Sequence, residues 1–105
     1  MPTSETTPNT SRTLVVIPNY NGLRFLPDCM EALFRQTVTN FTVLVIDNAS
    51  GGDDITWLRT WQAEDPVRRQ LLLNDANLGF SGAVNQGIRI AMEEHYEFTL
   101  LLNND

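Results

Sequence analysis

Four short apolar runs, separated by longer segments with helical spacing, constrain the fold of this chain more than any other feature. The runs are Thr13 to Ile17, Phe41 to Ile46, Leu71 to Leu73 and Phe98 to Leu102. Each is continuous rather than alternating in polarity, as is typical of strands covered on both faces in a parallel sheet. The pattern predicts a βαβαβαβ order with right-handed crossovers. We therefore expect an α/β fold with a doubly wound, mainly parallel sheet.

Three helices are predicted between these strands. Apolar residues recur at helical spacing within residues 25–34, 55–61 and 80–91. Asp53 or Asp54 is placed to cap the second helix. In the third helix the apolar stripe is Phe80, Val84, Ile88 and Ala91, and Gly82, Ala83 and Gly87 would let the helix approach the sheet closely. Before the third strand, Arg68 and Arg69 are expected to end a loop in water.

The two ends of the chain suggest how it is organised. Residues 1–12 are rich in Thr, Ser, Pro and Asn, so we predict a disordered tail followed by one domain at 13–105. The last predicted strand lies at the end of the sequence, and no helix follows it. One edge of the sheet would then be uncovered. The sequence therefore suggests a domain truncated after its fourth strand, although a partner chain could also cover that edge.

Composition excludes several classes of function. The net charge is −6, which argues against a nucleic-acid partner, and all seven basic residues are Arg. A phosphate-binding lysine is therefore excluded. The single cysteine, Cys29, allows neither an intrachain disulfide nor a cysteine-based zinc site. The sequence shows no secretory signal and no apolar stretch long enough to cross a bilayer, so a cytoplasmic setting is expected.

In a doubly wound sheet, ligands bind beyond the carboxyl ends of the strands. The first strand is followed by Pro18-Asn19-Tyr20-Asn21-Gly22, in which Pro18 is expected to stop the strand. Tyr20 could stack on a base or close the side of a pocket. The segment could equally be an ordinary turn. Its one glycine excludes a dinucleotide-binding turn or a P-loop, because both need several glycines.

The next two strand ends carry polar loops. Asp47 follows the second strand and could accept hydrogen bonds from ribose hydroxyls or a pyrimidine imide, or it could cap a turn. The loop at residues 74–82 is rich in Asn and Gly and leads into a helix N-terminus, which favours anionic ligands. Its glycines could also serve only to permit positive φ angles.

The fourth strand ends in Asn103-Asn104-Asp105. Three oxygen-bearing side chains suit a hard cation such as Mg²⁺ or Mn²⁺. Such a cation could carry the charge of a diphosphate in a chain that has no lysine. On its own, this triplet would be interpreted as a polar turn.

Taken together, these strand ends resemble family 2 glycosyltransferases of the GT-A fold. The matching segments are Val-Ile-Pro-Asn-Tyr-Asn-Gly at 16–22, Val-Ile-Asp-Asn-Ala-Ser at 45–50, Asn-Leu-Gly-Phe-Ser-Gly-Ala-Val-Asn-Gln-Gly at 77–87 and Leu-Leu-Asn-Asn-Asp at 101–105. Each segment alone is unspecific, whereas their order and spacing are specific. The Asn-Leu-Gly-Phe and Asn-Asn-Asp variants are similar to a branch containing rhamnosyltransferase-like enzymes.

The resemblance implies roles for individual residues. Pro18 and Tyr20 would line the base pocket, and Asp47 would hydrogen-bond the base or ribose. Asn77 and Gly79 would shape the nucleotide loop. The interpretation requires that these strand ends converge on one crevice, with Asp47 on one wall and Asp105 on the other.

Asn103 and Asp105 would occupy the outer positions of the family's Asp-x-Asp motif. The resemblance implies that Asp105 binds the divalent cation, Mg²⁺ or Mn²⁺, on the donor diphosphate. Asn103 departs from the motif by replacing an Asp. An amide oxygen is a weaker ligand than a carboxylate, so the metal would bind less tightly, or Asn103 would contact ribose or sugar.

The family reaction implied is inverting glycosyl transfer from a UDP-, dTDP- or GDP-linked sugar to a saccharide or lipid-linked acceptor. The catalytic base and the acceptor site would belong to a C-terminal half absent from these residues, so no catalytic residue is assigned and the isolated chain is expected to be inactive. It would work in the cytoplasm or peripherally at the inner face of the membrane. The alternative is a non-catalytic nucleotide-binding or interaction module with this fold. A nucleotidyltransferase would need a Gly-rich loop after the first strand, which this sequence lacks.

Overall fold

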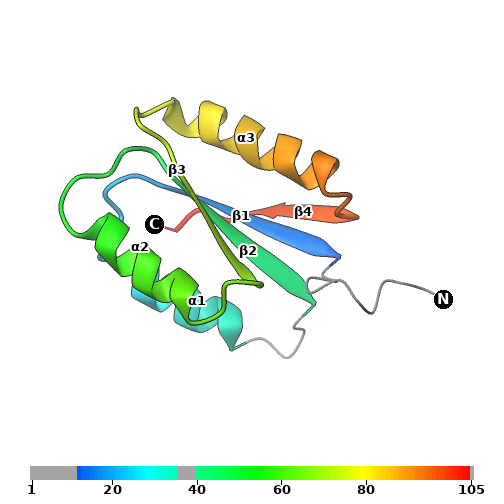
Figure 1. Ribbon diagram of the computed structural model, residues 1–105, viewed down its shortest axis with the longest axis horizontal. Coiled ribbons are helices and arrows are strands. Elements are labelled where there is room, and N and C mark those ends of the chain that lie inside the picture. The colour runs from blue at the N-terminus through cyan, green and yellow to red at the C-terminus, as the bar shows by residue number, and fades with distance from the viewer. Residues whose placement is uncertain (1–11, 36–39, 105) are drawn as a thin grey trace.

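The computed structural model describes residues 12–35 and 40–104, and these form one α/β layer structure (Figure 1). All strand pairs are parallel, and the strand order is β3-β2-β1-β4. The predicted alternation of strands and helices is confirmed. The elements are β1 (Thr13–Asn19), α1 (Leu26–Phe34), β2 (Phe41–Asp47), α2 (Asp54–Ala63), β3 (Arg69–Leu73), α3 (Gly79–Glu93) and β4 (Phe98–Leu101).

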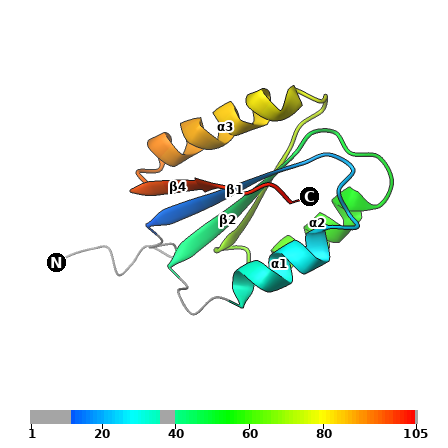
Figure 2. The ribbon, with the colours of Figure 1, turned by 180° about the vertical axis from the view of Figure 1, so that it is seen from behind.

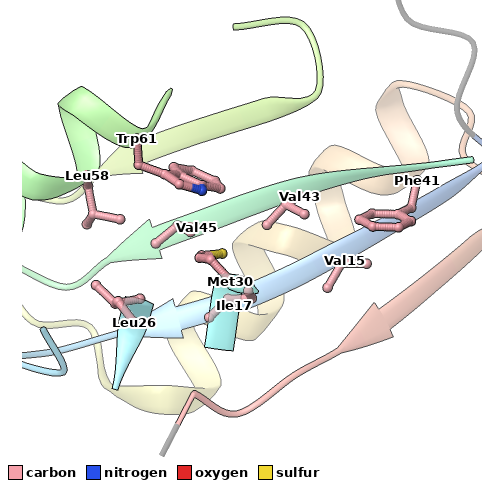
Figure 3. Close-up of a cluster of buried hydrophobic side chains, with 9 residues drawn as sticks. All are labelled: Val15, Ile17, Leu26, Met30, Phe41, Val43, Val45, Leu58 and Trp61. Atoms are coloured by element: carbon pink, nitrogen blue, oxygen red, sulfur yellow. The ribbon is translucent and has the colours of Figure 1, made fainter. Parts of the chain in front are cut away.

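Helices cover both faces of the sheet, which explains why the strands are continuously apolar. Helices α1 and α2 lie on one face and α3 on the other (Figures 1 and 2). On the first face, side chains from β1, β2, α1 and α2 form the larger core cluster (Figure 3). Leu58 of α2 is fully buried, and Trp61 lies one turn further along the same helix. Burying each such side chain contributes roughly 1.5–3 kcal/mol.

On the second face, α3 packs through small residues. Ala83, Gly87 and Ala91 are its buried positions. A Cβ added at Gly87 would lie 2.6 Å from Cγ1 of Val16, so the helix backbone approaches β1 closely, as predicted. The predicted apolar stripe is wrong in part, because Phe80 and Ile88 are about half exposed. The stripe that faces the sheet contains Ala83 and Gly87, each one residue before a position of the predicted stripe.

Pro18 does not stop β1, contrary to the prediction. The strand continues through Pro18 to Asn19, paired with Ile46 and Asp47 of β2. The backbone of Val16 faces β4, since its carbonyl accepts from Leu102, and that of Asn19 faces β2. Pro18 therefore faces the β4 side, where β4 pairs only as far as Val16. A proline is tolerated there because no ladder hydrogen bond requires its missing N–H.

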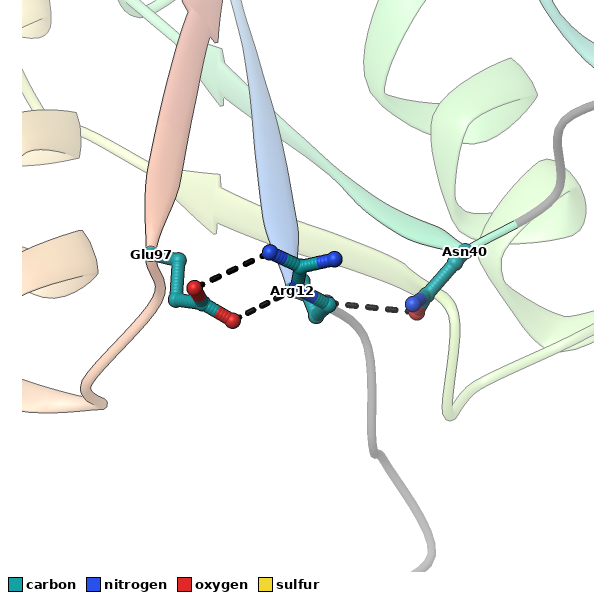
Figure 4. Close-up of polar contacts among 3 residues, drawn as sticks. All are labelled: Arg12, Asn40 and Glu97. Atoms are coloured by element: carbon teal, nitrogen blue, oxygen red, sulfur yellow. Dashed lines mark hydrogen bonds and ion pairs between the residues drawn. The ribbon is translucent and has the colours of Figure 1, made fainter.

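Polar contacts tie the strands together at their amino ends. Arg12 donates to the Glu97 carboxylate through Nε at 2.5 Å and Nη2 at 3.0 Å, and its backbone N–H donates to Oδ1 of Asn40 (Figure 4). Most of the predicted tail lies outside the described residues, but Arg12 is held against both neighbouring strands. None of the helices in the described part of the chain is long and apolar enough to cross a membrane.

Arg68 and Arg69 do not end a loop in water as expected. Arg68 donates to the Phe41 carbonyl at 2.8 Å. Arg69 begins β3, and its guanidinium lies over the rings of Phe34 and Trp61 at 4.9 and 5.5 Å. Both arginines are therefore structural at the amino end of the sheet, and they are not placed to meet a ligand beyond its carboxyl end.

Candidate functional site

The strand order reverses direction between β1 and β4, and a polar cavity lies beyond the carboxyl ends of the strands there. The chain moves outward from β1 through β2 to β3, and then returns to place β4 on the other side of β1. Such a reversal is where open α/β sheets bind ligands. The cavity measures about 290 Å³. It is lined by Pro18, Asn19, Tyr20, Asn48, Asn77, Gly79, Phe80, Asn103 and Asn104.

Five of the six residues predicted to bind a nucleotide line this polar cavity: Pro18, Tyr20, Asn77, Gly79 and Asn103. Pro18 lies near the end of β1 and Gly79 begins α3, whereas Tyr20, Asn77 and Asn103 lie in the segments that follow β1, precede α3 and follow β4. Tyr20 is 54% exposed, so its ring is available to a ligand. The convergence of separate strand ends that the sequence required is thus present for these residues.

Asp47 does not line the polar cavity. It is fully buried at the end of β2. One carboxylate oxygen accepts from Asn19 Nδ2 at 2.8 Å and from Ser50 Oγ at 2.7 Å, and the other accepts from the Ser50 backbone N–H at 2.9 Å. Both oxygens are engaged by the protein, as in the turn-capping alternative. Direct contact between Asp47 and a base or ribose stays a prediction, and the geometry favours the turn-capping role.

Asn19 connects the buried carboxylates to the cavity. Its Nδ2 donates to Asp47 at 2.8 Å and to Oδ2 of Asp54 at 3.1 Å. Its Oδ1 accepts from Asn104 Nδ2 at 2.7 Å. The side chain is 1% exposed and joins the ends of β1 and β4. Asp54 is thus held inside the fold, and Asp53 occupies the N-cap position of α2 without a side-chain capping bond.

A second asparagine, Asn48, forms another wall of the polar cavity. Its Nδ2 donates to the Gly79 carbonyl at 3.0 Å, and its Oδ1 accepts from Asn74 Nδ2 at 3.0 Å. Asn77 folds the same loop, since its Oδ1 accepts from the Gly79 N–H at 2.8 Å. Gly79 has a φ of +78°, which favours glycine at this position. The loop shape predicted from its Asn and Gly content is therefore built from specific bonds.

The electrostatics of the polar cavity favour an anionic ligand. Gly79 and Phe80 begin α3, a helix of 15 residues with no acidic residue in its first turn. Such an N-terminus carries partial positive charge and free N–H groups. Among the described residues, no Asp or Glu lines the cavity. A ligand phosphate would thus meet a helix dipole and amides at the described lining, with the buried carboxylates of Asp47 and Asp54 set behind Asn19.

The predicted metal ligand, Asp105, lies outside the described residues. Within the described part of the chain, no group of three or more His, Cys, Asp or Glu is placed to hold a metal. Asn103 and Asn104 line the cavity and carry amide oxygens, which Mg²⁺ or Mn²⁺ can accept as ligands. These ions also take one or two protein carboxylates, and the described lining supplies none, so metal binding through Asp105 stays a prediction.

Four lining residues were not assigned to the site by sequence reasoning: Asn19, Asn48, Phe80 and Asn104. All four lie next to an assigned residue in the sequence. Phe80 had been placed on the buried face of its helix, but it is 55% exposed and contributes to the cavity. The signal that could have found the asparagines is their density at strand ends, since an amide supplies both a donor and an acceptor.

A larger cavity, of about 700 Å³, lies between α1 and the β1–β4 side of the sheet. Its lining is mainly apolar and includes Phe25, Cys29, Leu33 and Leu100. Burial raises the pKa of the Cys29 thiol, which makes it a poor nucleophile at neutral pH. Asn103 and Asn104 line both cavities, but most of the predicted nucleotide-binding residues line only the polar cavity, which is therefore the candidate site.

The family model for glycosyl transferase family 2 matches residues 14–105. The chain belongs to this family. Relatives include an undecaprenyl-phosphate mannosyltransferase of Micrococcus luteus, 34% identical over 90% of this chain, and the uncharacterized glycosyltransferase YibD of Escherichia coli, 32% identical over 86% of it. Both relatives are longer than this chain, which covers 38% and 26% of their lengths.

Solved structures of other proteins share the fold. The mannosyltransferase PcManGT of Pyrobaculum calidifontis, in complex with GDP-Man and Mn²⁺, superposes with a TM-score of 0.69 at 24% identity, over 80% of this chain and 26% of that one. The expected α/β architecture of the GT-A type is thus confirmed. The rhamnosyltransferase-like branch stays a prediction.

Proposed function

We propose that the polar cavity binds the nucleoside part of a nucleoside-diphosphate sugar, as the donor site of a glycosyltransferase. The observation that supports this most directly is the convergence of Pro18, Tyr20, Asn77, Gly79 and Asn103 on one cavity at the sheet reversal. The exposed ring of Tyr20 is suited to stack on a base. The amides offer both donors and acceptors to a base edge or to ribose hydroxyls.

The diphosphate would extend toward the N-terminus of α3 and the end of β4. The helix N-terminus favours negative charge, and Asn103 and Asp105 would hold the divalent cation. When bound, this cation would neutralise the diphosphate, a task that no lysine of this chain can perform. The Mn²⁺ in the complex of the Pyrobaculum mannosyltransferase with GDP-Man supports this assignment.

The transfer reaction itself needs a carboxylate base for the acceptor hydroxyl. No Asp or Glu lines the polar cavity among the described residues, so we propose that these 105 residues alone bind the donor without transferring the sugar. The proposed reaction is inverting transfer to a saccharide or a lipid-linked acceptor. The cytoplasmic setting, free or at the inner face of the membrane, belongs to the same proposal.

Titration calorimetry with UDP, dTDP and GDP, each with and without Mn²⁺, tests donor binding. We expect metal-dependent binding of one of the three and a loss of affinity of roughly fivefold or more in Tyr20→Ala, since stacking on a base contributes about 1–3 kcal/mol. Phe98→Ala is the matched control, because Phe98 is similarly exposed, at 57%, and lies outside the polar cavity. A folded sample that binds none of the nucleotides would contradict the proposal.

A nucleotide-binding module without transfer chemistry is the second candidate. Two observations favour it: the described part of the cavity lining lacks a carboxylate, and Asn103 stands where the family motif has Asp. Asp105→Ala separates the two candidates. The donor site of an enzyme should lose the metal-dependent part of its nucleotide affinity in this variant, whereas a module that has lost the chemistry should keep it.

A further inference from the structure

A chain of amide side chains runs from the middle of α3 to the wall of the polar cavity. Asn74 follows β3, and Gln86 lies on α3. Neither lines the cavity. Their amides form a reciprocal pair, in which Asn74 Nδ2 donates to Gln86 Oε1 at 2.8 Å and Gln86 Nε2 donates to Asn74 Oδ1 at 2.9 Å. The second hydrogen of Asn74 Nδ2 reaches Oδ1 of Asn48 at 3.0 Å.

The polarity of this chain is fixed at its cavity end by the backbone. Asn48 Nδ2 faces the Gly79 carbonyl at 3.0 Å, and Asn48 Oδ1 faces the Leu78 N–H at 3.4 Å. A carbonyl cannot donate and an N–H cannot accept, so the Asn48 amide has one allowed orientation. Because Asn48 presents its oxygen, Asn74 must present its nitrogen. That choice in turn sets the orientation of Gln86.

The amide chain joins three elements that meet at the polar cavity. It begins on α3, passes the end of β3, and reaches Asn48 after β2. The Asn74 backbone N–H also donates to the Asp47 carbonyl at 2.9 Å. Through Asn48 the chain holds the carbonyl of Gly79, and thereby the loop that carries Asn77 and Phe80 into the cavity. Every member is neutral, so the wall is fixed without adding a charge beside an anionic ligand.

We propose that Asn74 and Gln86 are positioning residues for the nucleotide. They act through Asn48 to hold the wall formed by residues 77–80 in the shape that accepts the nucleoside. A fully satisfied polar network selects one arrangement, and a partly satisfied one allows several. Loss of either residue therefore lowers nucleotide affinity more than it lowers the stability of the fold. The inference rests on the proposed function, because it assumes that the polar cavity binds a nucleotide.

Asn74→Asp is the test variant, because it keeps the size of the side chain and replaces the NH₂ donor group with an oxygen that can only accept. The new carboxylate faces the oxygens of Asn48 and Gln86. The probe is the nucleotide, UDP, dTDP or GDP, that the unmodified chain binds most tightly with Mn²⁺. We expect roughly tenfold weaker binding at pH 7, on the scale of one hydrogen bond to a charged group.

The pH dependence of Asn74→Asp separates positioning from a general loss of stability. A protonated carboxyl donates one hydrogen bond and can restore the contact with Asn48. As the pH falls from 7 to 5, the nucleotide affinity of the variant should therefore approach that of the unmodified chain. Urea unfolding of both chains at pH 7 and pH 5 accompanies the titration, and an affinity ratio that changes only in step with the difference in unfolding free energy would indicate a general loss of stability.

Gln70→Glu is the matched control at the other end of β3. Gln70 Nε2 donates to the carbonyls of Pro66 and Val67 at 3.0 and 2.9 Å, away from the polar cavity. Gln70→Glu places a carboxylate oxygen against two backbone oxygens, as Asn74→Asp places one against two amide oxygens. It should lower stability and leave nucleotide affinity within about twofold.

Three results would overturn the inference. The first is binding by Asn74→Asp within twofold of the unmodified chain, and the second is an equal loss in Gln70→Glu. If Asn74→Asp does not fold, Gln86→Met replaces it, because Met retains the length of the side chain on α3; undiminished nucleotide binding by Gln86→Met is the third. If the unmodified chain binds no nucleotide at all, the proposed function fails first, and that outcome is visible before any variant is compared.

Discussion

At the scale of single residues, Gly22 is the position where the smallest change should disturb the candidate site. A Cβ added there would lie 2.6 Å from Asn19 Oδ1 and 2.8 Å from Asn104 Nδ2, the two atoms that join the ends of β1 and β4. Gly22→Ala should break this bond and destabilise the fold by about 1–3 kcal/mol. Urea unfolding would measure the loss.

Gly51→Ala provides the control for that substitution. Gly51 lies in the neighbouring loop, and an added Cβ would meet nothing within 4 Å. Its backbone N–H donates to Asn21 Oδ1 at 2.8 Å, a bond that alanine can also make. The unfolding free energy of this variant should therefore change little. Equal effects of the two substitutions would show that the contact between Asn19 and Asn104 does not matter for stability.

The ion pair between Arg12 and Glu97 gives stability a pH dependence at the opposite end of the sheet. The hydrogen bond from Arg12 lowers the pKa of Glu97 below its usual value of 4.5. A carboxylate whose pKa is lower in the folded state stabilises the protein fully above the unfolded pKa. That contribution is lost as the pH falls through the folded value.

Glu97→Gln should therefore lower the unfolding free energy at pH 7 by a small amount, and the difference from the unmodified chain should shrink below pH 4.5. The effect is small because the pair is exposed. Chemical unfolding at pH 7 and pH 3 measures both differences. A difference that grows on acidification would contradict the assignment.

Residue types at strand ends could be predicted to form a site, but their partners could not. The rule that ligands bind beyond parallel strands marked the segments, and the resemblance to family 2 glycosyltransferases assigned roles to Pro18, Tyr20, Asn77, Gly79 and Asn103. For Asp47, the sequence left a ligand contact and a capped turn equally open. The choice depends on where Ser50 and Asn19 lie in three dimensions. Local spacing does not contain that information.

At the scale of elements, helix α3 shows what hydrophobic periodicity can and cannot decide. The stripe containing Phe80 and Ile88 and the stripe containing Ala83 and Gly87 have the same spacing. The sequence correctly indicated a helix and a close approach to the sheet at Ala83 and Gly87, but it also placed the larger Phe80 and Ile88 on the buried face. The sheet instead receives the small residues, because β1 and β2 are already lined with branched side chains that leave little room.

This close packing predicts a compensating pair of substitutions. Gly87→Ala should destabilise the fold by about 1–3 kcal/mol, because the added Cβ would lie 2.6 and 2.9 Å from the two methyl carbons of Val16. In a Val16→Ala background those methyl groups are absent. In that background, Gly87→Ala should lower the free energy of unfolding by less, or raise it through the higher helical propensity of alanine.

A double-mutant cycle on urea unfolding measures this coupling. We expect an interaction free energy of about 1 kcal/mol or more between positions 16 and 87. Asn85→Ala serves as a reference substitution, because Asn85 is exposed on the same helix. Additive effects of Gly87→Ala and Val16→Ala would contradict the close approach of α3 to β1.

At the scale of the whole molecule, β4 forms an exposed apolar edge of the sheet. All four residues of this strand are exposed, and it pairs on one side only, with β1, within the described residues. Phe98, Leu100 and Leu101 are 57%, 51% and 43% exposed. The sequence predicted this uncovered edge, because no later element within these residues could pack on it. An apolar edge strand is a template for pairing with another chain.

The uncovered edge predicts self-association of the isolated 105-residue chain. Sedimentation velocity should show a sedimentation coefficient that rises with protein concentration, and Leu100→Lys should suppress the rise, because a lysine on an edge strand opposes pairing. Met92→Lys is the control: Met92 is 72% exposed on α3, and the substitution adds the same charge without touching the strand edge. If both lysines suppress association equally, net charge rather than the β4 edge governs it. If neither does, β4 is not the contact.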